Sequence, residues 1–172
     1  MSTTAARAPA PPLVTAALIL GGPAVLGACV GMRAGLSSLL GYTLSLPALV
    51  LGVGAVMLPA LYILAAFVGV APSAKRVLRV ASETLADLGR LLLGFVPALG
   101  FLTLSSQDPA NAPVLGLLAL GAATLLGLRA LYLRLFAAKR RGLLSLALYL
   151  AWSSVCLGIG WHLSTLALEV QP

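Results

Sequence analysis

Long apolar stretches separated by short polar segments divide this chain into membrane spans. A helix needs about 20 mostly apolar residues to cross the roughly 30 Å hydrocarbon core of a bilayer. The third stretch meets this length only if it begins near Leu85, because its purely apolar part covers 91–104. We expect spans at about residues 13–32, 47–71, 85–104, 113–133 and 143–166. Barrel strands would alternate apolar and polar positions, so the pattern predicts an all-α, polytopic integral membrane bundle of about five transmembrane helices.

The polar segments complete this organisation. Residues 1–11 are small and polar, so we expect a disordered cytoplasmic tail before a single transmembrane helical domain at 12–170. Residues 73–84 place charges three or four positions apart, which puts them on one helical face. We interpret this stretch as a cytoplasmic amphipathic segment lying on the membrane surface and leading into the third span.

Composition excludes the other classes of protein. Hydrophobic residues make up 60% of the chain and charged residues only 9%, with a mean hydropathy of +1.07. A soluble domain has about 25% charged residues, and a disordered chain has the opposite bias. The chain is therefore expected to be solvated by lipid.

The formal net charge of +7 indicates orientation. Lysine and arginine accumulate on the cytoplasmic side of membrane proteins. With five spans and the N-terminus inside, ten of the eleven basic residues share that side and only Arg33 falls outside: Arg7, Lys75, Arg76, Arg79, Arg90, Arg129, Arg134, Lys139, Arg140 and Arg141. This predicts an N-in/C-out multi-pass protein with no need for a nucleic-acid partner. The chain is rich in alanine, leucine and glycine, as bacterial proteins often are, so we expect it in the bacterial cytoplasmic (inner) membrane.

The charges nearest the inner boundary form the candidate site: Glu83, Asp87, Arg90, Arg129 and Arg134. Charges within a span are costly unless they are paired, so they are functional candidates. Asp87 and Arg129 are expected at one depth on neighbouring helices, which favours a pair between them. Alternatively, the three arginines form a basic pocket for an anionic lipid headgroup. The expected partners are the bilayer and its anionic headgroups on the cytoplasmic side.

Prolines and glycines mark helix shape and contact. Pro23, Pro59 and Pro97 lie near the middle of three spans, where proline bends a helix. Broken helices build substrate sites in transporters, but no acid or amide accompanies these prolines. Gly27, Gly31 and Gly35 repeat every four residues and predict a helix-packing face. We consider another membrane protein or a second copy as the partner of that face.

Chemistry-bearing motifs are scarce. The chain has one histidine and four acids, and its sequence contains no HExxH, GxSxG or CxxC motif. His162 follows Trp161 at the expected outer interface, where it is interpreted as an anchor. We expect no enzymatic activity, no cofactor and no metal site. Leu26-Gly27-Ala28-Cys29 is similar to a bacterial lipobox, so cleavage before Cys29 remains an alternative to a retained first span.

Over roughly Val70 to Leu168, the order of elements resembles bacterial members of the Yip1-like membrane family. The similar features are the basic segment 75–80, Pro97 in the third span, Gly127-Leu128-Arg129 at the inner end of the fourth, and a fifth span. The resemblance implies a five-helix scaffold or trafficking-type membrane protein without enzymatic activity. We expect a scaffold or accessory subunit of a membrane assembly with a basic cytoplasmic face. The alternative is a small permease, or permease subunit, using the proline-kinked helices.

Overall fold

The computed structural model describes residues 11–32, 34–67, 73–106, 111–136 and 143–169. They form five helices: α1 (Pro12–Gly31), α2 (Leu36–Phe67), α3 (Ala74–Ser105), α4 (Asn111–Phe136) and α5 (Leu143–Glu169). Each is long and apolar enough to cross a membrane, which confirms the predicted all-α class with five candidate spans. The tail 1–10 and several residues used to predict orientation (Arg7, Arg33 and 139–141) lie outside the described residues.

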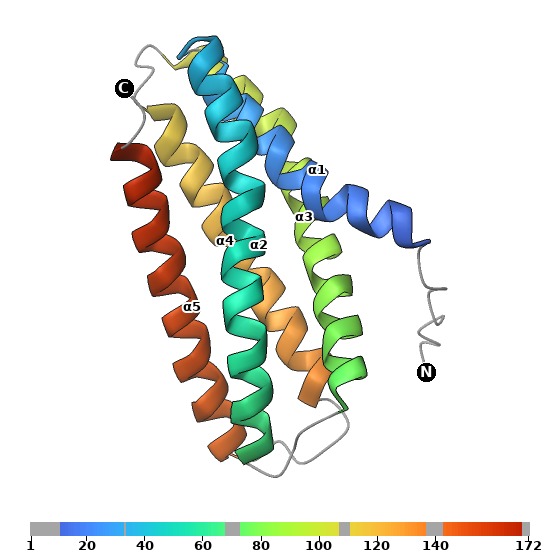
Figure 1. Ribbon diagram of the computed structural model, residues 1–172. Coiled ribbons are helices and arrows are strands. Elements are labelled where there is room, and N and C mark those ends of the chain that lie inside the picture. Colours follow the sequence, from blue (N-terminus) through green and yellow to red (C-terminus); the bar gives the residue numbers. More distant parts are fainter. Residues whose placement is uncertain (1–10, 33, 68–72, 107–110, 137–142, 170–172) are drawn as a thin grey trace, which may run out of the picture.

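The helices lie side by side as a bundle in which α1 runs obliquely (Figure 1). α1 packs closely against α2 and α3, and α3 packs against α4. α5 contacts α2 and, to a lesser extent, α4. We call the end where α2 and α4 finish and where α3 and α5 start the basic end, because the charged residues of α3 and α4 gather there.

α2 starts earlier than the sequence suggested. It begins at Leu36, whereas the predicted span began at Pro47, and Pro47 lies inside the helix. Membrane helices tolerate internal proline because neighbouring helices and side chains satisfy the freed backbone groups. The turn before α2 contains Gly35 with a φ of 100°, a backbone conformation that glycine adopts without a steric cost.

The amphipathic segment 73–84 is not a separate surface helix. It forms the first turns of α3, which continues without interruption to Ser105. Val77, Val80 and Ala81 are buried, so the apolar face of this segment packs against the bundle. Burial against protein explains why the segment stays in line with the span. At 1.5 Å per residue, the 32 residues of α3 extend about 48 Å, well beyond the roughly 30 Å hydrocarbon core.

Glycines allow α1 to approach its neighbours closely. A Cβ atom at Gly22 would lie 2.5 Å from the Cα of Gly89 on α3, and one at Gly89 would overlap the carbonyl of Leu18. Small residues let membrane helices approach backbone to backbone in this way. The contact between α1 and α3 therefore requires glycine on both helices.

Of the three glycines in the predicted packing face, two lie within α1 and the third lies beyond its end. A Cβ atom at Gly27 would overlap the Tyr42 carbonyl on α2, and one at Gly31 would lie 2.5 Å from the Cα of Leu39. These two glycines thus pack within the chain and are covered by α2. Gly35 lies beyond the last residue of α1 with no atom near its Cβ position, so the expectation of one continuous three-glycine face is wrong.

Substituting alanine for glycine at two positions on α3 tests this packing. Gly89→Ala is expected to lower the free energy of unfolding by about 1–3 kcal/mol, because an added methyl group forces the α1 backbone away. Gly94→Ala is the matched control, since nothing lies within 4 Å of its Cβ position. The control should be neutral or stabilising by up to about 1 kcal/mol. Titration with sodium dodecyl sulfate in mixed micelles measures both, and equal effects would contradict the close approach.

Candidate functional site

One carboxylate on α3 is shared by two arginines. The Nη2 of Arg134, on α4, donates a hydrogen bond to Asp87 Oδ2 at 2.6 Å. Arg90, one turn further along α3, donates from its Nη1 to Asp87 Oδ1. All three side chains are between 31% and 38% exposed. Because two guanidinium groups share one carboxylate, the cluster keeps a net charge of +1.

Helix geometry brings Asp87 and Arg134 together. Side chains in an α-helix lean toward its N-terminus. α3 begins at the basic end and α4 finishes there, so the Asp87 carboxylate leans toward that end and the Arg134 side chain leans away from it (Figure 1). The two groups approach each other across the interface between α3 and α4. This pairing joins two helices, whereas Arg90 and Asp87 pair within one.

The predicted pair between Asp87 and Arg129 is wrong. Arg129 is exposed and makes no ion pair with another described residue. Five residues, or about 140° around the helix at 3.6 residues per turn, separate Arg129 from Arg134. Arg129 was expected at the same depth as Asp87, but its side chain does not lie on the face of α4 that meets α3. Glu83 is also exposed and, among the described residues, has no ion-pair partner.

Arg134 has unused hydrogen-bonding capacity. Its Nη1 atom is buried and has no hydrogen-bond partner in the described part of the chain. Most buried polar atoms in proteins are hydrogen-bonded, so such an atom requires a physical explanation. The chain therefore does not use the full hydrogen-bonding capacity of this guanidinium group.

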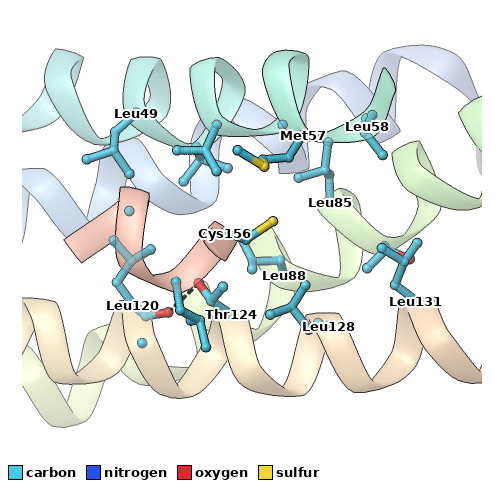
Figure 2. A pocket seen from close by; sticks show the side chains of 18 of the residues that line it. Leu49, Met57, Leu58, Leu85, Leu88, Leu120, Thr124, Leu128, Leu131 and Cys156 are labelled. Atoms are coloured by element: carbon cyan, nitrogen blue, oxygen red, sulfur yellow. Dashed lines mark hydrogen bonds between the residues drawn. The ribbon is translucent and has the colours of Figure 1, made fainter. Parts of the chain in front are cut away.

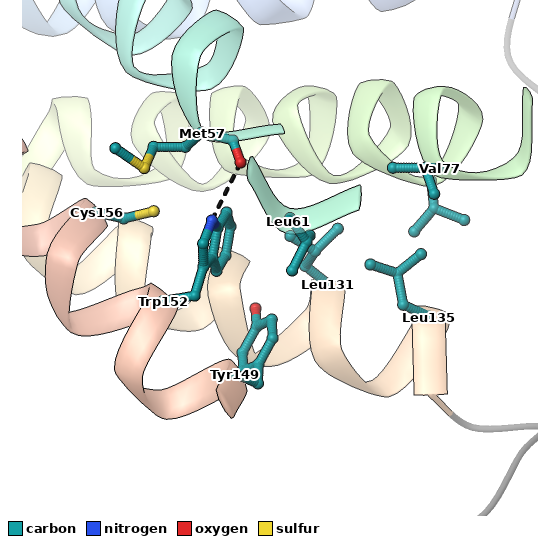
Figure 3. Packing of buried hydrophobic residues seen from close by; sticks show 9 residues of the cluster. Met57, Leu61, Val77, Leu131, Leu135, Tyr149, Trp152 and Cys156 are labelled. Atoms are coloured by element: carbon teal, nitrogen blue, oxygen red, sulfur yellow. Dashed lines mark hydrogen bonds between the residues drawn. The ribbon is translucent and has the colours of Figure 1, made fainter. Parts of the chain in front are cut away.

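Two aromatic side chains attach α5 to the bundle. Trp152 Nε1 donates to the Met57 carbonyl on α2 at 3.1 Å (Figure 3), and the Tyr149 hydroxyl donates to the Leu128 carbonyl on α4 at 2.5 Å. The rings of Tyr149 and Trp152 lie 5.5 Å apart. Both residues belong to a core cluster that draws on α2, α3, α4 and α5. Sequence reading missed this pair, although a tyrosine and a tryptophan three residues apart within a span share one face and both need hydrogen-bond partners.

An apolar cavity of about 390 Å³ lies among α2, α3, α4 and α5 (Figure 2). Aliphatic side chains, glycines, Cys156 and both tryptophans form most of its wall. The Thr84 and Thr124 hydroxyls in the wall donate to the carbonyls of Val80 and Leu120, at 2.8 and 2.7 Å. Their hydrogens are thus already engaged with their own helices. The interior presents a surface suited to hydrocarbon.

The three prolines do not meet at this cavity. Pro23 is fully buried in α1, while Pro59 and Pro97 are exposed on α2 and α3. None of them is among the lining residues. The structure therefore does not assemble the three candidate kinks into one path.

The residues most often used in chemistry are dispersed. His162 is exposed on α5, Cys29 is partly buried in α1 and Cys156 is buried in α5. Within the described ranges, no group of three His, Cys, Asp or Glu side chains is placed to hold a metal ion. Cleavage before Cys29 would remove the part of α1 that carries Pro23 and Leu26, two of the most completely buried side chains.

No protein-family model matches this chain, and neither the curated proteins nor the solved structures yield a match.

A double-mutant cycle tests the ionic link. Asp87→Asn and Arg134→Gln should be non-additive, with a coupling free energy of about 1 kcal/mol, as expected for residues in direct contact. The cycle of Asp87→Asn with Arg129→Gln is the control and should be additive within about 0.3 kcal/mol. Both are measured as free energies of unfolding in mixed micelles. Coupling to Arg129 in place of Arg134 would show that the assigned pairing is wrong.

Proposed function

We propose that this protein is a non-enzymatic scaffold or accessory subunit of a membrane assembly, working through its basic end. The proposal places it in the bacterial cytoplasmic membrane with the basic end toward the cytoplasm. Acidic segments of partner proteins and anionic lipid headgroups are the groups that such a surface attracts.

The observation that carries the proposal is the start of α3. Lys75, Arg76 and Arg79 are all exposed there, while Val77 and Val80, on the opposite face, are buried in the bundle. The helix is longer than the hydrocarbon core, so its first turns can extend beyond the membrane. A basic surface on a helix that is packed in place is pre-organised for binding, which lowers the entropy lost on association.

Two further points support this function. The resemblance to Yip1-like membrane proteins implies a five-helix scaffold without enzymatic activity, and the bias of basic residues toward one side favours a cytoplasmic basic face. The permease alternative depended on three kinked helices acting together. Their prolines face different surroundings, and the wall of the cavity is apolar, so no observation favours that alternative.

Native purification tests the scaffold role. A variant carrying Lys75→Gln, Arg76→Gln and Arg79→Gln should lose a membrane protein that co-purifies with the wild type in mild detergent. The matched control, Arg76→Lys with Arg79→Lys, keeps the charge and should retain that protein. An identical co-purifying set in all three preparations would contradict the proposal. Saturable solute flux in proteoliposomes would favour the permease instead.

Cysteine accessibility tests the orientation. In a background of Cys29→Ser and Cys156→Ala, single cysteines are introduced by Lys75→Cys at the basic end and Ser37→Cys at the start of α2, both at exposed positions. A membrane-impermeant maleimide should label the Ser37→Cys variant in intact cells. The Lys75→Cys variant should react only after permeabilisation. The reverse pattern would place the basic end outside.

A further inference from the structure

We propose that the cavity among α2, α3, α4 and α5 binds one hydrocarbon chain of a phospholipid whose phosphate is held by Arg134. The inference is independent of the scaffold role, because it concerns the interior of the bundle and not its exposed basic surface. It rests on the shape of the cavity, the chemistry of its wall and the charge at one end.

The cavity is elongated along the helix axes. On α4 the lining residues run from Leu117 to Leu131, which is 14 residue steps or about 21 Å at 1.5 Å per residue. One leaflet of the hydrocarbon core is about 15 Å thick, half of the roughly 30 Å total. An extended acyl chain lying parallel to the helices therefore fits this length. The volume of about 390 Å³ falls within the range of ligand sites, roughly 300–1,000 Å³.

The four helices leave this space because two pairs, α2 with α4 and α3 with α5, make no close backbone contact along the described residues. α5 bridges α2 and α4 through Trp152 and Tyr149. The side chains of Leu49 and Met57 face the space from α2, and that of Leu120 faces it from α4 (Figure 2). A smaller apolar cavity, of about 150 Å³, binds benzene in another protein. A cavity more than twice as large, within a membrane protein, is a site for hydrocarbon.

An unmatched positive charge lies about one helical turn beyond the last cavity-lining residue of α4. Leu131 lines the cavity, and Arg134 follows it by three residues, so the two side chains neighbour each other on α4. Arg134 and Arg90 share the single Asp87 carboxylate, which leaves a net charge of +1. The Arg134 side chain is 38% exposed, so a lipid phosphate can approach it. Such a phosphate neutralises the charge, and guanidinium groups bind phosphate well.

Apolar and ionic features thus lie in the order that a phospholipid requires. The chain would occupy the apolar length, and the phosphate would sit where the protein offers a guanidinium. A partner helix would fill the space with side chains, but apolar packing alone would not supply an anion to Arg134. This complementarity favours a phospholipid over a second copy of the chain.

The two tryptophans provide a direct readout. They are the only tryptophans in the sequence, and both line the cavity. Trp152 is 9% exposed, whereas Trp161 is 65% exposed and accessible to bulk lipid. In a Trp161→Phe background, Trp152 fluorescence is followed while phosphatidylglycerol with brominated chains is added to the delipidated protein in detergent. Bromine quenches only at close range, so saturable quenching at one lipid per protein is expected.

Two glycines on α2 provide matched variants. Gly54 lines the cavity and Gly52 does not, and nothing lies within 4 Å of the Cβ position of either. A Cβ atom at either position therefore meets no neighbouring atom. Gly54→Leu should abolish the saturable quenching because its side chain fills the cavity. Gly52→Leu should leave the quenching unchanged. Equal quenching of the two variants would overturn the proposal.

The headgroup is tested with brominated phosphatidylcholine and with inorganic phosphate. Phosphatidylglycerol should bind about tenfold more tightly than phosphatidylcholine, and Arg134→Gln should remove that preference while Arg129→Gln keeps it. Inorganic phosphate should not displace the lipid at millimolar concentration. Equal affinity of the wild type and of Arg134→Gln for phosphatidylglycerol would overturn the role of Arg134. A wild-type dimer that Gly54→Leu converts to a monomer, without saturable quenching, would assign the cavity to a second copy.

Discussion

A carboxylate shared by two guanidinium groups is the interaction around which the basic end of this bundle is organised. Charge near a bilayer boundary is costly unless it is paired, and Asp87 pairs with arginines from its own helix and from α4. The link fixes how α3 and α4 meet at the end where their charges gather. It also leaves one positive charge over, next to an apolar cavity. The packing of α3 against α4 and the excess positive charge at the basic end therefore involve one group of three side chains.

The rest of the bundle uses two different kinds of contact. At α1 the helices meet backbone to backbone, because Gly22, Gly27 and Gly89 remove the side chains that would separate them. At α5 the contact is made by large aromatic side chains whose polar atoms bond to carbonyls of α2 and α4. Glycine contacts close the space between helices, whereas the aromatic contacts hold α5 at a distance. The cavity lies on the aromatic side, so its position follows from where glycine and aromatic residues occur.

The class of fold could be predicted from the sequence, because spans of about 20 apolar residues are read directly from composition. Helix limits were less predictable: Pro47 resembles a helix start, yet it lies within α2. The candidate site was predicted as a set of charges at one depth, but depth does not specify the direction in which a side chain points. Arg129 and Arg134 could be distinguished only by the face of α4 that meets α3. The cavity and the bonds of Trp152 and Tyr149 depend on contacts between distant helices, which no local pattern encodes.

Solid-state nuclear magnetic resonance in lipid bilayers tests the central pairing most directly. With ¹³C in aspartate carboxylates and ¹⁵N in arginine guanidinium groups, dipolar dephasing reports nitrogens near a carboxylate carbon. An Arg90→Lys background isolates the contact between Arg134 and Asp87. The account predicts strong dephasing of one aspartate signal, which Asp87→Asn removes and Arg129→Lys leaves in place. Absence of dephasing from Asp87 in that background, or dephasing that disappears with Arg129→Lys, would contradict it.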